Sequence, residues 1–163
     1  MPELELLEQN LLIKSLTIIQ MDNVVYLDFK AKELDNIRSG HKTMIIRGAM
    51  GRKLPYGRVN KGDVLYFIEN NGDGVVKGKA TVESVFNSDI LTKEQSIEIV
   101  LQNQPKLHLN KGLEQRFAGK RYLVLITIKD FSDIEPFKID RSEYGNMDDW
   151  LPVEDIEKVK LRK

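Results

Sequence analysis

The stretch VVKGKATVESVF, residues 75–86, alternates apolar or small residues with polar ones. Alternation with a period of two predicts a half-buried β-strand, because successive side chains of a strand point to opposite faces. One face would hold Val76, Gly78, Ala80 and Val82, and the other would hold Lys77, Lys79, Thr81 and Glu83. This longest alternating segment predicts a fold built on a sheet.

Four further segments have the composition of strands, since they are rich in β-branched and aromatic residues. They are residues 23–29, 42–47, 64–68 and 122–128. Between them the sequence predicts only short helices. Five strands and short helices favour an α+β, mainly β fold, a small closed or nearly closed barrel decorated by helices.

The first of these helices, over residues 31–39, would end at Gly40, a residue that commonly stops helices. A second would begin at Thr92, where Thr-x-x-Gln forms a capping box, and would close at Pro105. A third would cover residues 113–118.

Composition limits the class of protein. The chain has 163 residues, of which 41% are hydrophobic and 31% charged, as in soluble globular proteins. It has no cysteine and two histidines, so it lacks the ligands of a zinc site, and we expect no metal and no cofactor.

The N-terminus carries glutamates where a secretory signal has positive charge, and its apolar run over 11–19 is too short to span a bilayer. We expect a cytoplasmic monomer without a membrane partner.

Charge is unevenly distributed although the net charge is zero. Residues 38–62, here called the basic segment, hold seven cations and no acid: Arg38, Lys42, Arg47, Arg52, Lys53, Arg58 and Lys61. Residues 130–157, the acidic region, hold ten acids and two cations. A local excess of positive charge attracts phosphates, and Tyr56 offers a stacking surface for a base. The alternative is that the basic segment pairs with the acidic region of the same chain.

Strand geometry constrains this basic segment. Lys42 and Arg47 are an odd number of residues apart, so they would point to opposite faces of a regular strand. Both can serve one site only if a bulge intervenes or if Lys42 lies in the turn after Gly40.

Three motifs in order resemble the ASCH domain of the PUA-like superfamily: GHKTMIIR at 40–47, NKGDVLYF at 60–67 and GKATVESV at 78–85. The resemblance covers about residues 24–131 and implies a PUA-like β-barrel of about five to six strands. It divides the chain into an N-terminal extension (1–22), the barrel domain (23–137) and an acidic C-terminal segment (138–163) that packs on the barrel, anchored by Trp150.

The resemblance implies RNA or nucleotide recognition in a cleft with Lys42 and Arg47 at its floor. Together with the charge pattern it predicts a nucleic-acid-binding site formed by Lys42, Thr43, Arg47, Arg52, Lys53, Tyr56 and Arg58.

Two alternatives remain. Some small ASCH proteins are similar enough to imply an amidohydrolase of acylated cytidine, with Lys42 as the candidate catalytic residue and Glu83 or Glu98 as an acidic partner. Ile45, however, occupies both the position of the family's threonine and that of the glutamate in Lys-x-x-Glu-x-Arg, so we expect binding without catalysis. The other alternative is a non-catalytic interaction module whose basic segment pairs with its own acidic tail.

Overall fold

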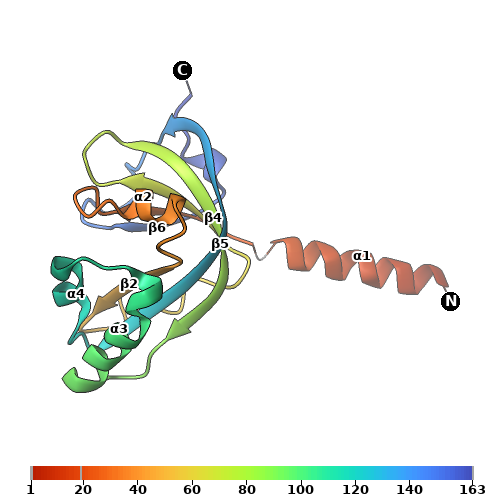
Figure 1. The fold of residues 1–163 in the computed structure, drawn as a ribbon. Coiled ribbons are helices and arrows are strands. Elements are labelled where there is room, and N and C mark those ends of the chain that lie inside the picture. Colours follow the sequence, from red (N-terminus) through yellow and green to blue (C-terminus); the bar gives the residue numbers. More distant parts are fainter. Residues whose placement is uncertain (1, 19, 163) are drawn as a thin grey trace.

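The computed structural model describes residues 2–18 and 20–162. Six strands form one sheet in the order β2-β5-β4-β3-β1-β6 (Figure 1). The strands are β1 (Asp22–Leu27), β2 (Met44–Ala49), β3 (Val64–Glu69), β4 (Val75–Asn87), β5 (Tyr122–Lys138) and β6 (Trp150–Glu154). The sheet curls into a half-barrel, so the α+β, mainly β class is confirmed, although the sheet stays open between β2 and β6.

Neighbouring strands are antiparallel except for β1 and β3, which pair in parallel. All five predicted strands are present. The sixth, β6, follows them in sequence and pairs with β1 so that Trp150 lies opposite Val25. The pairing joins the C-terminal part of the chain to the same sheet, whereas the domain division at residues 22 and 137 stays a prediction.

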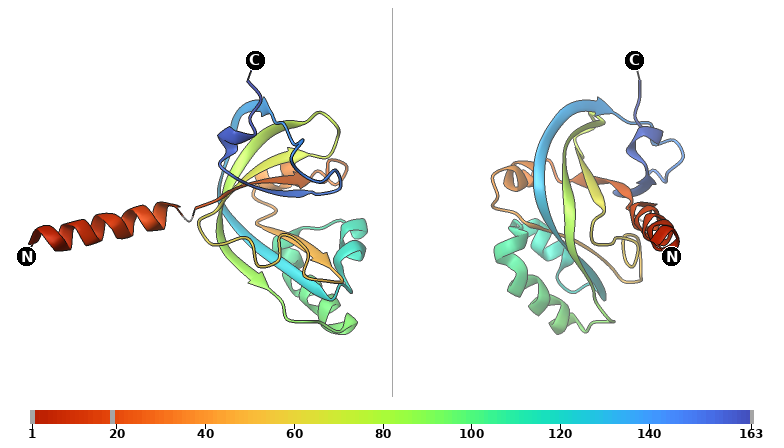
Figure 2. Two further views of the ribbon diagram at one scale, coloured as in Figure 1. Left: turned by 180° about the vertical axis from the view of Figure 1, so that it is seen from behind. Right: turned by 90° about the vertical axis from the view of Figure 1, so that its right-hand side faces the viewer.

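The curvature of the sheet comes from β4 and β5, the two longest strands (Figure 2). Their register shifts three times, near Gly78, Thr81 and Ser84, and such irregularities bend a strand and increase its twist. Gly78 lies under the ring of Phe131, where a Cβ would approach two ring atoms to 2.7 and 2.8 Å. The small residue predicted for this strand face is therefore needed for the two strands to pack.

Helical elements accompany the sheet in the described part of the chain. They are α1 (Pro2–Ile18), α2 (Glu33–Arg38), α3 (Lys93–Leu107), α4 (Lys111–Phe117) and the 3₁₀ turn η1 (Ile156–Lys158). The capping box of α3 is confirmed, because Thr92 and Gln95 exchange side-chain and backbone hydrogen bonds. Pro105 does not close α3 as predicted: the helix runs two residues further and ends at His108, whose φ is 49°.

The core is divided into three clusters. The main cluster fills the inside of the curled sheet and includes Ile45, Phe67 and Trp150. A second packs α3 and α4 against the other face of β2 and β5, through Met44 and Ile46. A third lies around β6 and η1. Because Ile45 and Arg47 alternate with Met44 and Ile46 along β2, Arg47 points to the same side as the main cluster.

The motif at residues 60–67 is structural. Asp63 is buried and accepts hydrogen bonds from the backbone nitrogens of Met21 (3.1 Å) and Asn60 (2.8 Å). The preceding Gly62 has a φ of 92°, which favours glycine. Both residues fix the turn that begins β3.

Helix α1 projects away from the sheet (Figures 1 and 2). Four of its leucines are exposed to solvent: Leu4, Leu6, Leu7 and Leu11. Of the helices in the described part of the chain, none combines the length and the apolar character needed to cross a membrane.

Candidate ligand-binding cleft

Arg47 is the central residue of the candidate site. It is 8% exposed, and its two terminal nitrogens donate to the backbone carbonyls of Ile46 (2.9 Å) and Tyr26 (2.6 Å). The third nitrogen, Nε, lies 3.3 Å from Asp149 but makes no hydrogen bond with any described residue. The guanidinium also lies over the ring of Trp150. β2 and the barrel core thus hold Arg47 in a fixed orientation, and Nε is its one nitrogen without a hydrogen bond to a described residue.

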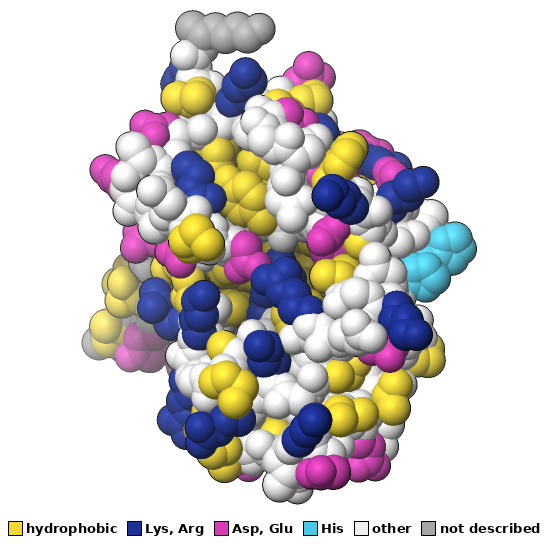
Figure 3. Space-filling view, turned by 90° about the vertical axis from the view of Figure 1, so that its left-hand side faces the viewer, with side chains coloured by type: hydrophobic (Ala, Val, Ile, Leu, Met, Phe, Trp, Pro, Cys, Tyr) yellow, Lys and Arg dark blue, Asp and Glu magenta, His cyan; other side chains and the backbone are white. Residues whose placement is uncertain are grey.

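Two adjoining pockets open beside Arg47, and they share Arg47, Arg116, Phe117 and Asp149. The smaller has a volume of about 60 Å³ and the larger about 400 Å³. Small-molecule sites have roughly 300–1,000 Å³, so the larger pocket reaches that size and the smaller one does not. We call the two pockets together the cleft. On the side of the molecule shown in Figure 3, Lys and Arg side chains gather across the middle and lower half.

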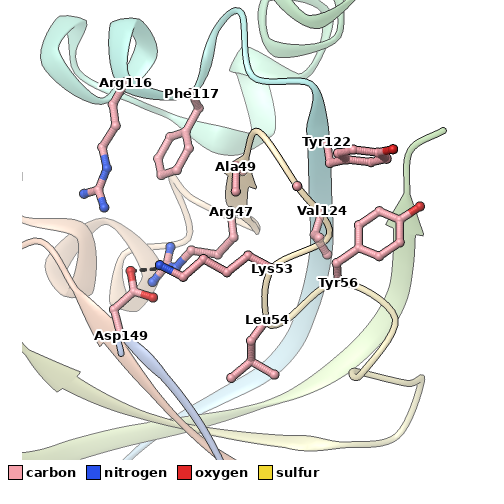
Figure 4. Close-up of a pocket in the computed structure, with 12 residues that line it drawn as sticks. Arg47, Ala49, Lys53, Leu54, Tyr56, Arg116, Phe117, Tyr122, Val124 and Asp149 are labelled. Atoms are coloured by element: carbon pink, nitrogen blue, oxygen red, sulfur yellow. Dashed lines mark ion pairs between the residues drawn. The ribbon is translucent and has the colours of Figure 1, made fainter. Parts of the chain in front are cut away.

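The smaller pocket collects cations from three separate elements. Arg47 comes from β2, Lys53 from the loop after it, and Arg116 from α4. Figure 4 shows their side chains converging on the space beside Asp149. Three cations face one carboxylate here, so the pocket favours an anion.

The larger pocket has a mixed lining. Apolar surface comes from Tyr26, Leu113, Phe117 and Met147. Its cations are Arg47, Arg116 and Arg141, and its carboxylates are Asp28, Glu33, Asp148 and Asp149. Arg141 lies over the ring of Tyr26 and donates to the carbonyls of Gly145 and Asp148, so it holds the loop that forms one wall.

Lys42 lies beneath this cleft and lines neither pocket. It precedes β2, as the turn after Gly40 allows, and is 1% exposed. Its Nζ donates to the carbonyl of Leu107 at 2.6 Å and lies 3.3 Å from Glu33. Lys42 thus caps the C-terminus of α3, where free carbonyls and the helix dipole both favour a cation.

Burial lowers the pKa of Lys42, and the charge of Arg47 lowers it further, whereas Glu33 raises it. The acidic partner is Glu33, whose carboxylate also accepts from the backbone nitrogen of Asp28 at 2.8 Å. The two glutamates considered from sequence, Glu83 and Glu98, are exposed on β4 and α3. Ile45, at the threonine position of the hydrolase pattern, is fully buried in the main cluster.

The other predicted site residues differ in their position relative to the cleft. Lys53 and Tyr56 line the smaller pocket, whereas Thr43 and Arg58 are exposed and line neither pocket. Arg52 lies over the rings of Tyr56 and Tyr122. Tyr56 packs against the main cluster, and its hydroxyl donates to the carbonyl of Ser88. This contact fixes the ring and leaves it little freedom to stack on a ligand.

The basic segment is only partly neutralised within the chain. Two pairs join it to the acidic region, Arg38 with Asp133 at 2.9 Å and Arg47 with Asp149. Its remaining exposed cations form no ion pair within residues 2–18 and 20–162, and these are Arg52, Lys53, Arg58 and Lys61. Pairing with the acidic tail therefore accounts for part of the basic segment only.

The sequence matches no protein-family model and no curated protein. Solved structures do match in shape. Three crystal structures of ASCH from Zymomonas mobilis, two of them with a point substitution, superpose with a TM-score of 0.63 at 16% identity. The match covers 85% of this chain and 91–94% of those chains. The chain has the ASCH fold. The predicted ASCH barrel is thereby confirmed as a fold.

Within the ASCH fold, three residues of the cleft escaped the sequence-based prediction: Arg116, Asp149 and Glu33. Arg116 lies in a predicted helix far along the chain from the basic segment, and Asp149 belongs to a run of acids that looks solvated. Glu33 carried a usable signal, because it stands at the start of the helix that leads into the Gly-x-Lys-Thr motif.

Proposed function

We propose that this ASCH-fold protein binds RNA or a nucleotide in the cleft, with the phosphate at Arg47, Lys53 and Arg116. The observation that carries the proposal is Nε of Arg47, a buried nitrogen that lies 3.3 Å from Asp149 and makes no hydrogen bond with a described residue. Buried polar groups are nearly always hydrogen-bonded, so this nitrogen would gain a well-aligned acceptor if an anion displaced Asp149. A phosphate oxygen is an acceptor of the required charge.

The surroundings of Arg47 support an anionic ligand. Arg116 and Lys53 are exposed and approach from different elements, so they can adjust to a phosphate without distorting the barrel. The exposed cations of the basic segment extend the positive surface beyond the cleft, which suits a polymer with several phosphates. Arginine and lysine contacts with phosphates supply affinity that depends little on the base sequence of the RNA.

For the base, Phe117 supplies part of the apolar wall because it lines both pockets, although it is buried and Arg116 lies over its ring. Leu113 adds apolar surface from the same helix. Tyr56, the residue predicted for this role, is engaged with Ser88 and the main cluster.

Fluorescence anisotropy with a labelled single-stranded RNA oligonucleotide tests the proposal. Binding should weaken steeply as salt rises, because phosphate contacts release counterions. Arg116→Ala should weaken binding and reduce the salt slope by about one unit. Lys111→Ala is the matched control, since Lys111 lies on the same helix, loses the same charge and lines neither pocket. A protein without RNA or nucleotide affinity at low salt would contradict the proposal.

A further inference from the structure

The two pockets of the cleft differ in size and in charge. From this difference we infer the class of ligand: a nucleotide unit that ends in a phosphomonoester, with the phosphate in the smaller pocket and the nucleoside in the larger one. The inference rests on the proposed function and adds to it the chemical end group that the cleft selects.

The smaller pocket fits a phosphate group and excludes a base. Its volume of about 60 Å³ is far below the roughly 300 Å³ of the smallest small-molecule sites, so it has room for a compact group and none for a nucleoside. It is the more enclosed of the two pockets. An RNA chain passing through would need space on both sides of the phosphate, whereas a terminal phosphate needs one entrance.

The charge of the smaller pocket also favours a terminal phosphate. The smaller pocket holds three cations and one carboxylate, a formal charge of +2. A phosphomonoester carries about −1.5 to −2 at pH 7, whereas each phosphate inside an RNA chain carries one negative charge. The pocket therefore complements a terminal phosphate better than an internal one.

The larger pocket disfavours a second phosphate. It holds three cations and four carboxylates, and two of the cations, Arg47 and Arg116, are shared with the smaller pocket. What remains are carboxylates such as Asp28, next to the apolar surfaces of Leu113 and Phe117. Amino groups of a neutral base can donate to those carboxylates while the ring packs on the apolar side chains.

Isothermal titration calorimetry on the full chain tests the inference with cytidine, its 5′- and 3′-monophosphates and inorganic phosphate. A monophosphate should bind at least about tenfold more tightly than cytidine, the effect of about 1.5 kcal/mol for a hydrogen bond between charged groups. It should also bind more tightly than inorganic phosphate, because the nucleoside adds contacts in the larger pocket. The 5′ and 3′ forms distinguish the two ends of an RNA chain as the source of the phosphate.

Short RNA oligonucleotides with and without a terminal phosphate extend the test to polymers. The phosphorylated end should bind more tightly, and Lys53→Ala should abolish that preference. Lys61→Ala is the control, because Lys61 is an exposed lysine of the same loop that lines neither pocket. Salt-dependent RNA binding that is equally tight with and without the terminal phosphate would overturn the inference and leave the proposed function intact. Absence of binding by every RNA and nucleotide would overturn both.

Discussion

The carboxylate of Asp149 lies 3.3 Å from Nε of Arg47, at the point where the two pockets meet. Asp149 directly precedes β6 and its side chain is 44% exposed, whereas the side chain of Arg47 is 10% exposed. The carboxylate occupies the position that a bound anion would need. Under the proposed function, Asp149 is an internal competitor for the ligand's phosphate.

Replacing Asp149 by asparagine should tighten binding of a phosphate-containing ligand. The partly exposed ion pair contributes about 1 kcal/mol or less, so the expected gain in affinity is up to roughly fivefold. Titration calorimetry with cytidine monophosphate measures it. Asp148→Asn is the control, because Asp148 lines only the larger pocket. Weaker binding by Asp149→Asn would mean that Asp149 contributes to the site instead of competing for it.

Lys42→Met should strongly destabilise the fold. It leaves the buried Glu33 without its cation and removes the hydrogen bond to Leu107. Breaking a buried pair costs about 3–5 kcal/mol, whereas replacing both partners is far less costly. Urea unfolding should therefore show a large loss for Lys42→Met and partial recovery when Glu33→Gln is added. Equal stability of the single and double variants would show that the pair is not coupled.

The pH dependence of stability should depend on Lys42. Because burial lowers its pKa in the folded state, the unfolded chain binds the proton more tightly. The contribution of Lys42 to the free energy of unfolding therefore rises with pH, from the lowered pKa up to the ordinary value of 10.5. As the pH rises toward 10.5, urea unfolding of the wild type should gain stability relative to Lys42→Met. A constant difference across that interval would contradict the lowered pKa.

Tyr56 should matter for stability and little for affinity. Tyr56→Phe removes the donor to the Ser88 carbonyl and should cost about 1–3 kcal/mol of unfolding free energy. Tyr122→Phe is the control, since the Tyr122 hydroxyl makes no hydrogen bond in the described part of the chain. RNA affinity of Tyr56→Phe should equal that of the wild type. A loss of affinity at unchanged stability would instead assign Tyr56 to the ligand.

Gly78→Ala should destabilise the barrel. The added methyl group would meet the ring of Phe131, which is itself stacked on Phe67. Overpacking of this kind costs about 1–3 kcal/mol. Gly51→Ala is the matched control, because nothing lies within 4 Å of its added Cβ. Thermal unfolding of the two variants compares them, and equal melting temperatures would show that Phe131 moves aside freely.

The sequence predicted the sheet better than the cleft because strand alternation is a local signal. β4 could be identified from its own residues, whereas β6 has only five residues, includes Pro152 and is defined by its pairing with β1. The edge position of β6 explains why a proline is tolerated there. Its pairing could not be inferred from local pattern.

In the cleft, the positive charge was predicted and its geometry was not. Arg47 and Lys53 belong to the basic segment, but Arg116 and Asp149 reach the same space only because α4 and β6 are folded around β2. Lys42 was expected to contact the ligand because of the ASCH resemblance and its place in the basic segment. Its burial depends on the carbonyl of Leu107, which belongs to a helix far along the chain.

The pairing of β1 with β6 has a consequence for synthesis on the ribosome. Strands β1 to β5 emerge before β6, so during translation β1 lacks its antiparallel neighbour and the space for Trp150 in the main cluster stays empty. Native pairing at this edge must wait for residues 150–154, and contacts over such long separations in sequence slow folding. Nascent chains should therefore expose apolar surface until residues 150–154 have emerged, and chaperones can bind it during that interval.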